Sequence, residues 1–130
     1  MKKLLIISSI LGASGVILGA FGAHALKSIL SESQLLSYET GILYHLLHSI
    51  VILIIGILYH ITKNKRFITA GYIMIAGVLL FSFSIYLLSL KDYFGIPELK
   101  VLGPVTPIGG TLIIISWILI FINALSIKNE

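Results

Sequence analysis

Residues 4–25 read LLIISSILGASGVILGAFGAHA, an apolar run without a single Asp, Glu, Lys or Arg. A transmembrane helix needs roughly 20 such residues to cross about 30 Å of hydrocarbon. Three more runs of similar length follow, at about Thr40–His60, Ile68–Leu90 and Ile108–Leu125. Because none of them alternates apolar and polar residues, they predict helices rather than the strands of a membrane barrel. We therefore expect an all-α integral membrane four-helix bundle that forms a single domain over residues 1–130.

The overall composition agrees with this assignment. Hydrophobic residues make up 58% of the chain and charged residues 11%, and the mean hydropathy is +1.09, which leaves too little polar surface to cover a water-soluble globule. The chain contains no cysteine, so disulfides and thiolate metal sites are excluded. Its net charge of +4 comes mostly from lysines that flank the apolar runs, without the basic, aromatic-rich patch of a nucleic-acid-binding protein. We expect membrane lipid as a partner and no nucleic acid.

Basic residues are unevenly distributed between the two sides of the predicted bundle. If both termini lie on one side, that side holds six lysines or arginines: Lys2, Lys3, Lys63, Lys65, Arg66 and Lys128. The other side holds three: Lys27, Lys91 and Lys100. Since cytoplasmic loops carry the excess of Lys and Arg, the N and C termini are predicted to be cytoplasmic.

Two connecting segments contain helix-start signals. Ser31 and Gln34 have the spacing of a capping box, which predicts that the second helix begins near residue 32, well before its apolar run. Thr106 and Pro107 predict the start of the last helix, with Thr106 as N-cap and Pro107 as the first helical residue.

Small residues form a stripe along the first apolar run. Gly12, Gly15, Gly19 and Gly22 are spaced by three, four and three residues, which places them on one helix face. In a membrane such a stripe lets a second backbone approach closely, so we expect these glycines to serve helix packing, with space for a lipid or ligand as the alternative. Trp117 lies well inside the last run, too deep for an interfacial aromatic belt. We expect it in the core, with stacking on a ligand as the alternative, and we expect its indole N–H to find a partner within the bundle, for which Ser82 and Ser84 are candidates.

Three histidines lie within or at the end of the apolar runs. His45 and His48, three residues apart, share a face of the second predicted helix, and His24 lies nearly opposite the glycine stripe on the first. Ionisable residues at such depth usually face the bundle interior and are candidates for function. Three roles stay open: hydrogen bonding in the packed core, a binding or proton-handling site, and a metal or haem ligand. A metal site is disfavoured because Glu39 projects from another face and no cysteine is present.

The position of His24 leads to a specific expectation. An imidazole at the edge of the hydrocarbon is costly to bury without a polar partner. We therefore expect another helix beside His24, bringing its ring near Tyr44, near His48, or near the turn at residues 106–110.

Three stretches together resemble one family. GAFGAHALK at 19–27, ETGILYHLLHSIVILIIG at 39–56 and TPIGGTLIIISW at 106–117 are similar to the DUF423 family of small bacterial membrane proteins, which is related to eukaryotic transmembrane protein 256. The resemblance implies four transmembrane helices in a bacterial plasma membrane and no established activity. Positions that match the family pattern are Gly19, Phe21, Gly22, Ala23, His24, Tyr44, His48, Pro107, Gly109, Gly110 and Trp117. His45 lies outside that pattern.

These observations define a candidate polar cluster and three possible functions. The cluster consists of His24, Tyr44, His48, Thr106, Gly109 and Gly110. We expect a non-enzymatic packing or interaction module, without cofactor or metal, that acts with lipid, with other membrane proteins or with a second copy of itself. The alternative is a small-molecule or proton-binding site in the outer half of the bundle. A haem-carrying electron-transfer protein is a poorer alternative.

The predicted orientation is tested by cysteine labelling, since the natural chain has no cysteine. A cysteine introduced at Asn64, in the basic loop, is expected to react with an impermeant maleimide only after the membrane is permeabilised. A cysteine introduced at Glu98 is expected to react in intact cells. The reverse order of labelling would place both termini outside.

Overall fold

The computed structural model describes residues 1–127 and is built from long helices. These are α1 (Lys2–Ala23), α2 (Glu32–Thr62), α3 (Lys65–Phe94) and α4 (Val105–Leu125), with short 3-10 helices η1 (Leu26–Ser28) and η2 (Pro97–Leu102) in two of the connections. All four long helices are long and apolar enough to cross a membrane. The all-α, four-span fold expected from the sequence is confirmed. Lys128, counted above among the basic residues of the terminal side, lies outside the described residues.

Helix α2 extends well beyond its apolar run because its start is capped. The backbone N–H of Gln34 donates to Ser31 Oγ at 3.4 Å, and the backbone N–H of Ser31 donates to Gln34 Oε1 at 2.9 Å, which completes a capping box. Helix α3 also begins before its apolar run, since Asn64 Oδ1 accepts from the Arg66 amide at 3.0 Å. Caps of this kind satisfy the first free N–H groups of a helix.

The predicted start of α4 is wrong by a few residues. Thr106 is not the N-cap: the helix begins at Val105 and its N-cap is Pro104, without a capping side chain. Gly103 and Pro104 already have right-handed helical dihedral angles, so the chain enters the helix before Thr106. The Thr106 hydroxyl instead hydrogen bonds to the Ser84 hydroxyl of α3 at 2.7 Å.

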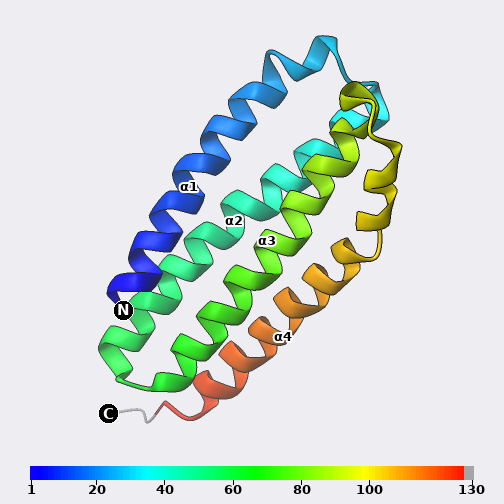
Figure 1. The fold of residues 1–130 in the computed structure, drawn as a ribbon. Helices are drawn as coiled ribbons and strands as arrows, with labels where there is room; N and C mark the ends of the chain where they lie inside the picture. Colours follow the sequence, from blue (N-terminus) through cyan, green and yellow to red (C-terminus); the bar gives the residue numbers. More distant parts are fainter. Residues whose placement is uncertain (128–130) are drawn as a thin grey trace.

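The four helices lie side by side in chain order, so that α1 and α4 form the two edges of a row (Figure 1). Each helix packs chiefly against its neighbours in the sequence, α1 on α2, α2 on α3 and α3 on α4. A shared apolar core still draws on all four, with Leu4, Ile52, Met74 and Ile113 among its buried members. An edge helix therefore has one principal partner and leaves its opposite face open to the bilayer.

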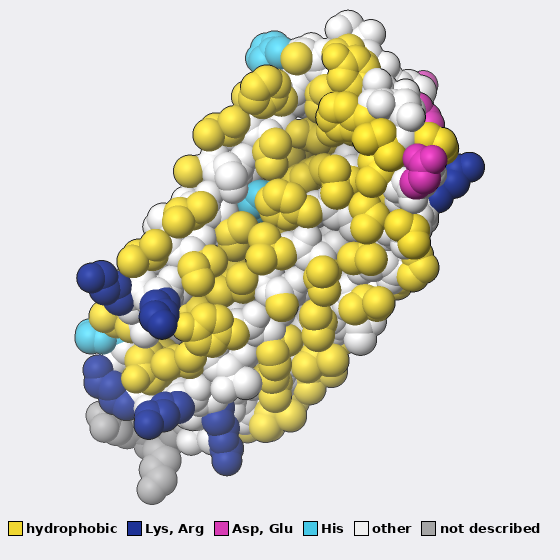
Figure 2. All heavy atoms as spheres, viewed as in Figure 1, with side chains coloured by type: hydrophobic (Ala, Val, Ile, Leu, Met, Phe, Trp, Pro, Cys, Tyr) yellow, Lys and Arg dark blue, Asp and Glu magenta, His cyan; other side chains and the backbone are white. Residues whose placement is uncertain are grey.

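Charged side chains are concentrated at the ends of the molecule. Figure 2 shows most Lys and Arg side chains at the end where α1 begins, with a largely hydrophobic surface between them and the opposite end. We call these the basic end, which holds Lys2, Lys3, Lys63, Lys65 and Arg66, and the far end, which holds residues 24–31 and 95–104. An apolar belt between two polar ends is the surface expected of a membrane-spanning bundle.

The glycine stripe of α1 faces α2. A Cβ atom placed on Gly15 would lie 2.7 Å from Leu46 Cδ2, and one on Gly22 would lie 2.8 Å from Tyr38 Cε1. Ile42 lies 3.3 Å from the equivalent position on Gly19. On Gly12 the nearest atom is the hydroxyl oxygen of a serine of α2, at 3.6 Å. The two helices approach closely because these positions carry no side chain.

Helices α3 and α4 approach even more closely, with backbone against backbone. A Cβ atom on Gly109 would contact the backbone nitrogen of Phe81 and would lie 2.9 Å from the carbonyl oxygen of Gly77. One on Gly77 would lie 2.9 Å from the backbone nitrogen of Ile113. Toward the basic end, Ser116 Oγ donates to the Ala70 carbonyl at 2.7 Å, which adds a buried polar link between the same helices.

A buried hydrogen-bond chain joins α1, α2 and α3. His45 is fully buried, with Nδ1 3.0 Å from the Tyr86 hydroxyl and Nε2 3.4 Å from Ser14 Oγ. Because Ser14 Oγ donates to the Leu11 carbonyl, it accepts from His45 Nε2–H, which leaves Nδ1 to accept from Tyr86. The chain ties the edge helix α1 to the two central helices.

Two adjacent glycines of α4 provide a matched test of the α3–α4 contact. Gly109→Ala is expected to lower the free energy of unfolding by about 1–3 kcal/mol, because the added methyl group meets backbone that cannot move aside. Gly110→Ala is the control, since its Cβ would lie 3.6 Å from the Phe81 ring, at ordinary contact distance. Thermal unfolding in detergent measures the stability of both variants. Equal stability of the two variants would contradict the backbone contact.

The chain through His45 is tested by removing the Tyr86 hydroxyl. Tyr86→Phe leaves His45 Nδ1 buried without its donor, which is expected to cost about 1–3 kcal/mol of stability. Tyr72→Phe on the same helix is the control, because Tyr72 is 44% exposed. In a double-mutant cycle with His45→Phe, the two losses are expected to be non-additive. Additive losses would show that the two side chains act independently.

Candidate functional site

A cleft opens between α2, α3 and α4, roughly midway along α2. Its volume is about 490 Å³. The lining residues are apolar or aromatic, and only Tyr44, His48 and Trp117 carry polar side-chain atoms: Leu43, Tyr44, Leu47, His48, Phe81, Gly110, Ile113, Ile114 and Trp117. Leu43, Leu47 and Ile114 are more than half exposed, so the mouth of the cleft lies on the surface that faces the hydrocarbon of a bilayer.

His48 forms the polar floor of this cleft. It is 3% exposed, and its Nδ1 lies 2.7 Å from the Tyr44 carbonyl oxygen. A carbonyl only accepts, so Nδ1 carries the proton; the Trp117 indole N–H only donates, so Nε2, at 3.5 Å, is the acceptor. His48 is therefore a neutral imidazole with both nitrogens engaged, and one of its partners belongs to α4.

Aromatic rings line the walls of the cleft. The Tyr44 and His48 rings stack with centroids 5.5 Å apart, and Tyr44 also lies 4.5 Å from the ring of Phe81. Trp117 meets His48 edge-on at 6.5 Å. The expectation of a core position for Trp117 is wrong, because its side chain is 46% exposed. Its N–H does find a partner within the bundle, but that partner is His48 rather than Ser82 or Ser84.

The candidate cluster predicted from the sequence is divided by the fold. Tyr44, His48 and Gly110 line the cleft. Gly109 is buried in the α3–α4 contact, and Thr106 lines a second, polar pocket nearer the far end.

The expected neighbours of His24 are wrong. Its side chain is exposed, and the shallow groove beside it is lined by Ile17, Ala20, Phe21 and Ala25, all from α1 and the turn that follows. The reason lies in the row of helices. The glycine face of α1 packs on α2, its one principal neighbour, so within residues 1–127 the opposite face, which carries His24, meets no other helix.

The metal and haem alternatives would use the ring nitrogens of the buried histidines, His45 and His48. Among residues 1–127, no three His, Cys, Asp or Glu side chains lie together as a metal would require. Both ring nitrogens of His48 and of His45 already have hydrogen-bond partners. Either ring would have to give up a partner to bind iron.

Several lining residues were not identified from the sequence. Leu47 follows Tyr44 at helical spacing, so the face of α2 that bears the cleft was readable in principle. Phe81 carries no local signal, because its place beside Tyr44 depends on the register between α2 and α3. His45 was set apart because it lies outside the family pattern, yet it is the buried centre of the three-helix hydrogen-bond chain.

Comparison with known proteins places the chain in a group of membrane proteins. It is 37% identical over 125 residues to the UPF0382 membrane protein YwdK of Bacillus subtilis, covering 95% of this chain and 97% of the relative. The UPF0382 membrane protein SAB0533 of Staphylococcus aureus is 38% identical over 123 residues, or 94% of each chain. No solved structure matches the chain at a significant level.

The family match covers most of the chain. Residues 18–110 match the family described as "Protein of unknown function (DUF423)". That segment runs from the glycine stripe of α1 to the first turns of α4 and includes Tyr44 and His48. With its four apolar helices and its named relatives, this chain is a multi-pass membrane protein and belongs to the DUF423 family.

Proposed function

We propose that the protein is a non-enzymatic membrane module whose cleft between α2, α3 and α4 holds the hydrocarbon chain of a membrane lipid. The observation that carries this proposal is the position of the cleft: it has apolar and aromatic walls and opens on the lipid-facing surface of spanning helices. An occupant that arrives from the side, through the bilayer, is an acyl or similar chain. Such a site requires no chemical step.

The hydrogen bonds of His48 support an apolar occupant. A proton-handling site at His48 needs a ring nitrogen that is free to interact, and both nitrogens of His48 are engaged by Tyr44 and Trp117. The imidazole thus contributes its ring face, stacked on Tyr44, rather than a hydrogen bond. These contacts favour lipid binding over the alternative of a proton-binding site at His48.

The physics of the bilayer sets what such a cleft can discriminate. Moving a chain from lipid into an apolar cleft gains nothing from the hydrophobic effect, because lipid tails are as apolar as the walls. Affinity must then come from van der Waals packing against the rings of Tyr44, Phe81 and Trp117. The cleft alone is expected to select the shape of a chain rather than a particular lipid.

The test uses Trp117, the only tryptophan of the chain. Lipids with brominated acyl chains quench tryptophan on contact, so titration of such a lipid into detergent-purified protein is expected to give saturable quenching at a single site. Gly110→Leu is expected to abolish the saturable part, because the added side chain extends from the lining into the cleft. Gly110→Ala adds only a methyl group at ordinary contact distance and is expected to keep it.

A second matched pair keeps the test decisive if Gly110→Leu fails to fold. Ile114 lines the cleft, whereas Ile118, one turn further along α4, does not, and both are more than half exposed. Ile114→Phe is expected to weaken the saturable quenching and Ile118→Phe to leave it unchanged. Quenching that rises without saturation in the natural protein, or that responds equally to both variants, would contradict a lipid site in the cleft.

A further inference from the structure

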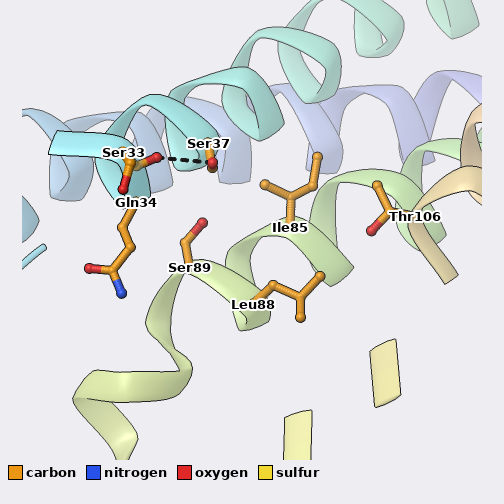
Figure 3. Close-up of a pocket in the computed structure, with 7 residues that line it drawn as sticks. All are labelled: Ser33, Gln34, Ser37, Ile85, Leu88, Ser89 and Thr106. Atoms are coloured by element: carbon orange, nitrogen blue, oxygen red, sulfur yellow. Dashed lines mark hydrogen bonds between the residues drawn. The ribbon is translucent and has the colours of Figure 1, made fainter. Parts of the chain in front are cut away.

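A second pocket lies between the same three helices, nearer the far end. Its volume is about 320 Å³. Unlike the cleft, it is lined mostly by hydroxyl and amide side chains: Ser33, Gln34, Ser37, Ile85, Leu88, Ser89 and Thr106. Figure 3 shows Ser89 rising from α3 toward Ser37 and Ser33 of α2, with Gln34 beside it and Thr106 on the other side of Ile85. We call this the polar pocket.

One hydroxyl of the polar pocket is buried and unused. Ser89 is 3% exposed, and its Oγ has no hydrogen-bond partner within residues 1–127. A buried hydroxyl without a partner is unfavourable, and a ligand group that hydrogen bonds to it removes that cost. Ser37 Oγ donates to the Ser33 carbonyl at 3.0 Å and so retains lone pairs that can accept from a ligand. The pocket thus offers a free donor on Ser89 and an acceptor on Ser37.

The charges around the polar pocket favour an uncharged ligand. No Lys, Arg, Asp or Glu lines it. Gln34 Nε2 donates to Asp92 at 2.8 Å, and that carboxylate pairs with Lys91 Nζ at 3.2 Å. Lys91 is therefore already paired, and a phosphate in the pocket would meet the Asp92 carboxylate at its rim. Hydroxyl groups, which both donate and accept, match this lining better than an anion does.

The polar pocket follows the cleft along the same helices, toward the far end. Thr106 of the pocket and Gly110 of the cleft are one turn apart on α4, and Ile85 and Phe81 are one turn apart on α3. On α2, Ser37 precedes Tyr44 by two turns, or about 10 Å. The two pockets thus follow one another along the same three helices, polar near the end of the spanning segment and apolar at depth. A membrane lipid has the same order, with its polar head group near the membrane surface and its apolar chains at depth.

We infer that the polar pocket binds an uncharged, hydroxyl-rich head group, such as a sugar, of the lipid whose chain occupies the cleft. The inference rests on the proposed function, because the cleft supplies the site for the chain. The polar pocket adds the selectivity among lipids that the apolar walls of the cleft lack. The Ser89 hydroxyl makes the central hydrogen bond to the head group. Ser37 and Thr106 line the space on either side of it.

The test compares three lipids on the full-length protein by native mass spectrometry from mild detergent. The probes are monoglucosyl-diacylglycerol, diacylglycerol without a sugar, and phosphatidylglycerol, all with the same acyl chains. The glucosyl lipid is expected to bind more tightly than either of the others. Ser89→Ala is expected to weaken its binding about fivefold, the effect of one lost neutral hydrogen bond, and to leave diacylglycerol binding unchanged.

Ser82→Ala is the matched control for this loss. Ser82 is also a buried serine of α3 whose Oγ has no partner within the described residues, but it does not line the polar pocket. Its replacement is expected to leave the binding of all three lipids unchanged. An equal effect of Ser82→Ala and Ser89→Ala would overturn the inference.

The three lipids separate the inference from the function on which it rests. If diacylglycerol binds and the sugar adds nothing, the head-group site is wrong while the chain site stands. If phosphatidylglycerol binds best, the pocket selects an anion and the inference is overturned. If none of the three binds to a saturable site, the proposed function itself fails. Binding of free methyl glucoside with the affinity of the glucosyl lipid would show a sugar site independent of the cleft.

Discussion

Close approach of helix backbones is the constraint on which the rest of this structure depends. Inside a bilayer, helices gain nothing by burying apolar side chains from lipid, so association relies on van der Waals contact and hydrogen bonds. Gly77 and Gly109 bring α3 and α4 together at the backbone, and the stripe that includes Gly15 and Gly22 does so for α1 and α2. These contacts hold each edge helix against its neighbour in the row.

Hydrogen bonds then determine how the closely packed helices are aligned. His45 links Ser14 of α1 to Tyr86 of α3, and Ser116 ties α4 to the Ala70 carbonyl. Each of these polar groups is satisfied by a neighbouring helix, which stabilises a single register in a low-dielectric interior. That register places the polar pocket and the cleft one after the other between α2, α3 and α4. Neither pocket could form from a single helix.

The sequence was informative wherever the signal is local. The four apolar runs, the capping box of Ser31 and Gln34 and the periodicity of the glycines follow from residue spacing within one helix. His48 was identified from its depth in an apolar run, and the family pattern supported it together with Tyr44. Interpretations that required the neighbour of a residue were less reliable: His24 has no helix beside it, Trp117 is half exposed, and Thr106 lies inside α4.

By itself, then, the sequence determined four membrane-spanning helices, their approximate ends and the small-residue faces on which they pack. Only the tertiary structure decided which helix each face meets, because a glycine stripe specifies close contact but not the partner. The open row leaves the His24 face of α1 uncovered and brings Phe81 beside Tyr44. Such pairings depend on the relative rotation and register of helices far apart in the chain, and no spacing within a single helix encodes them.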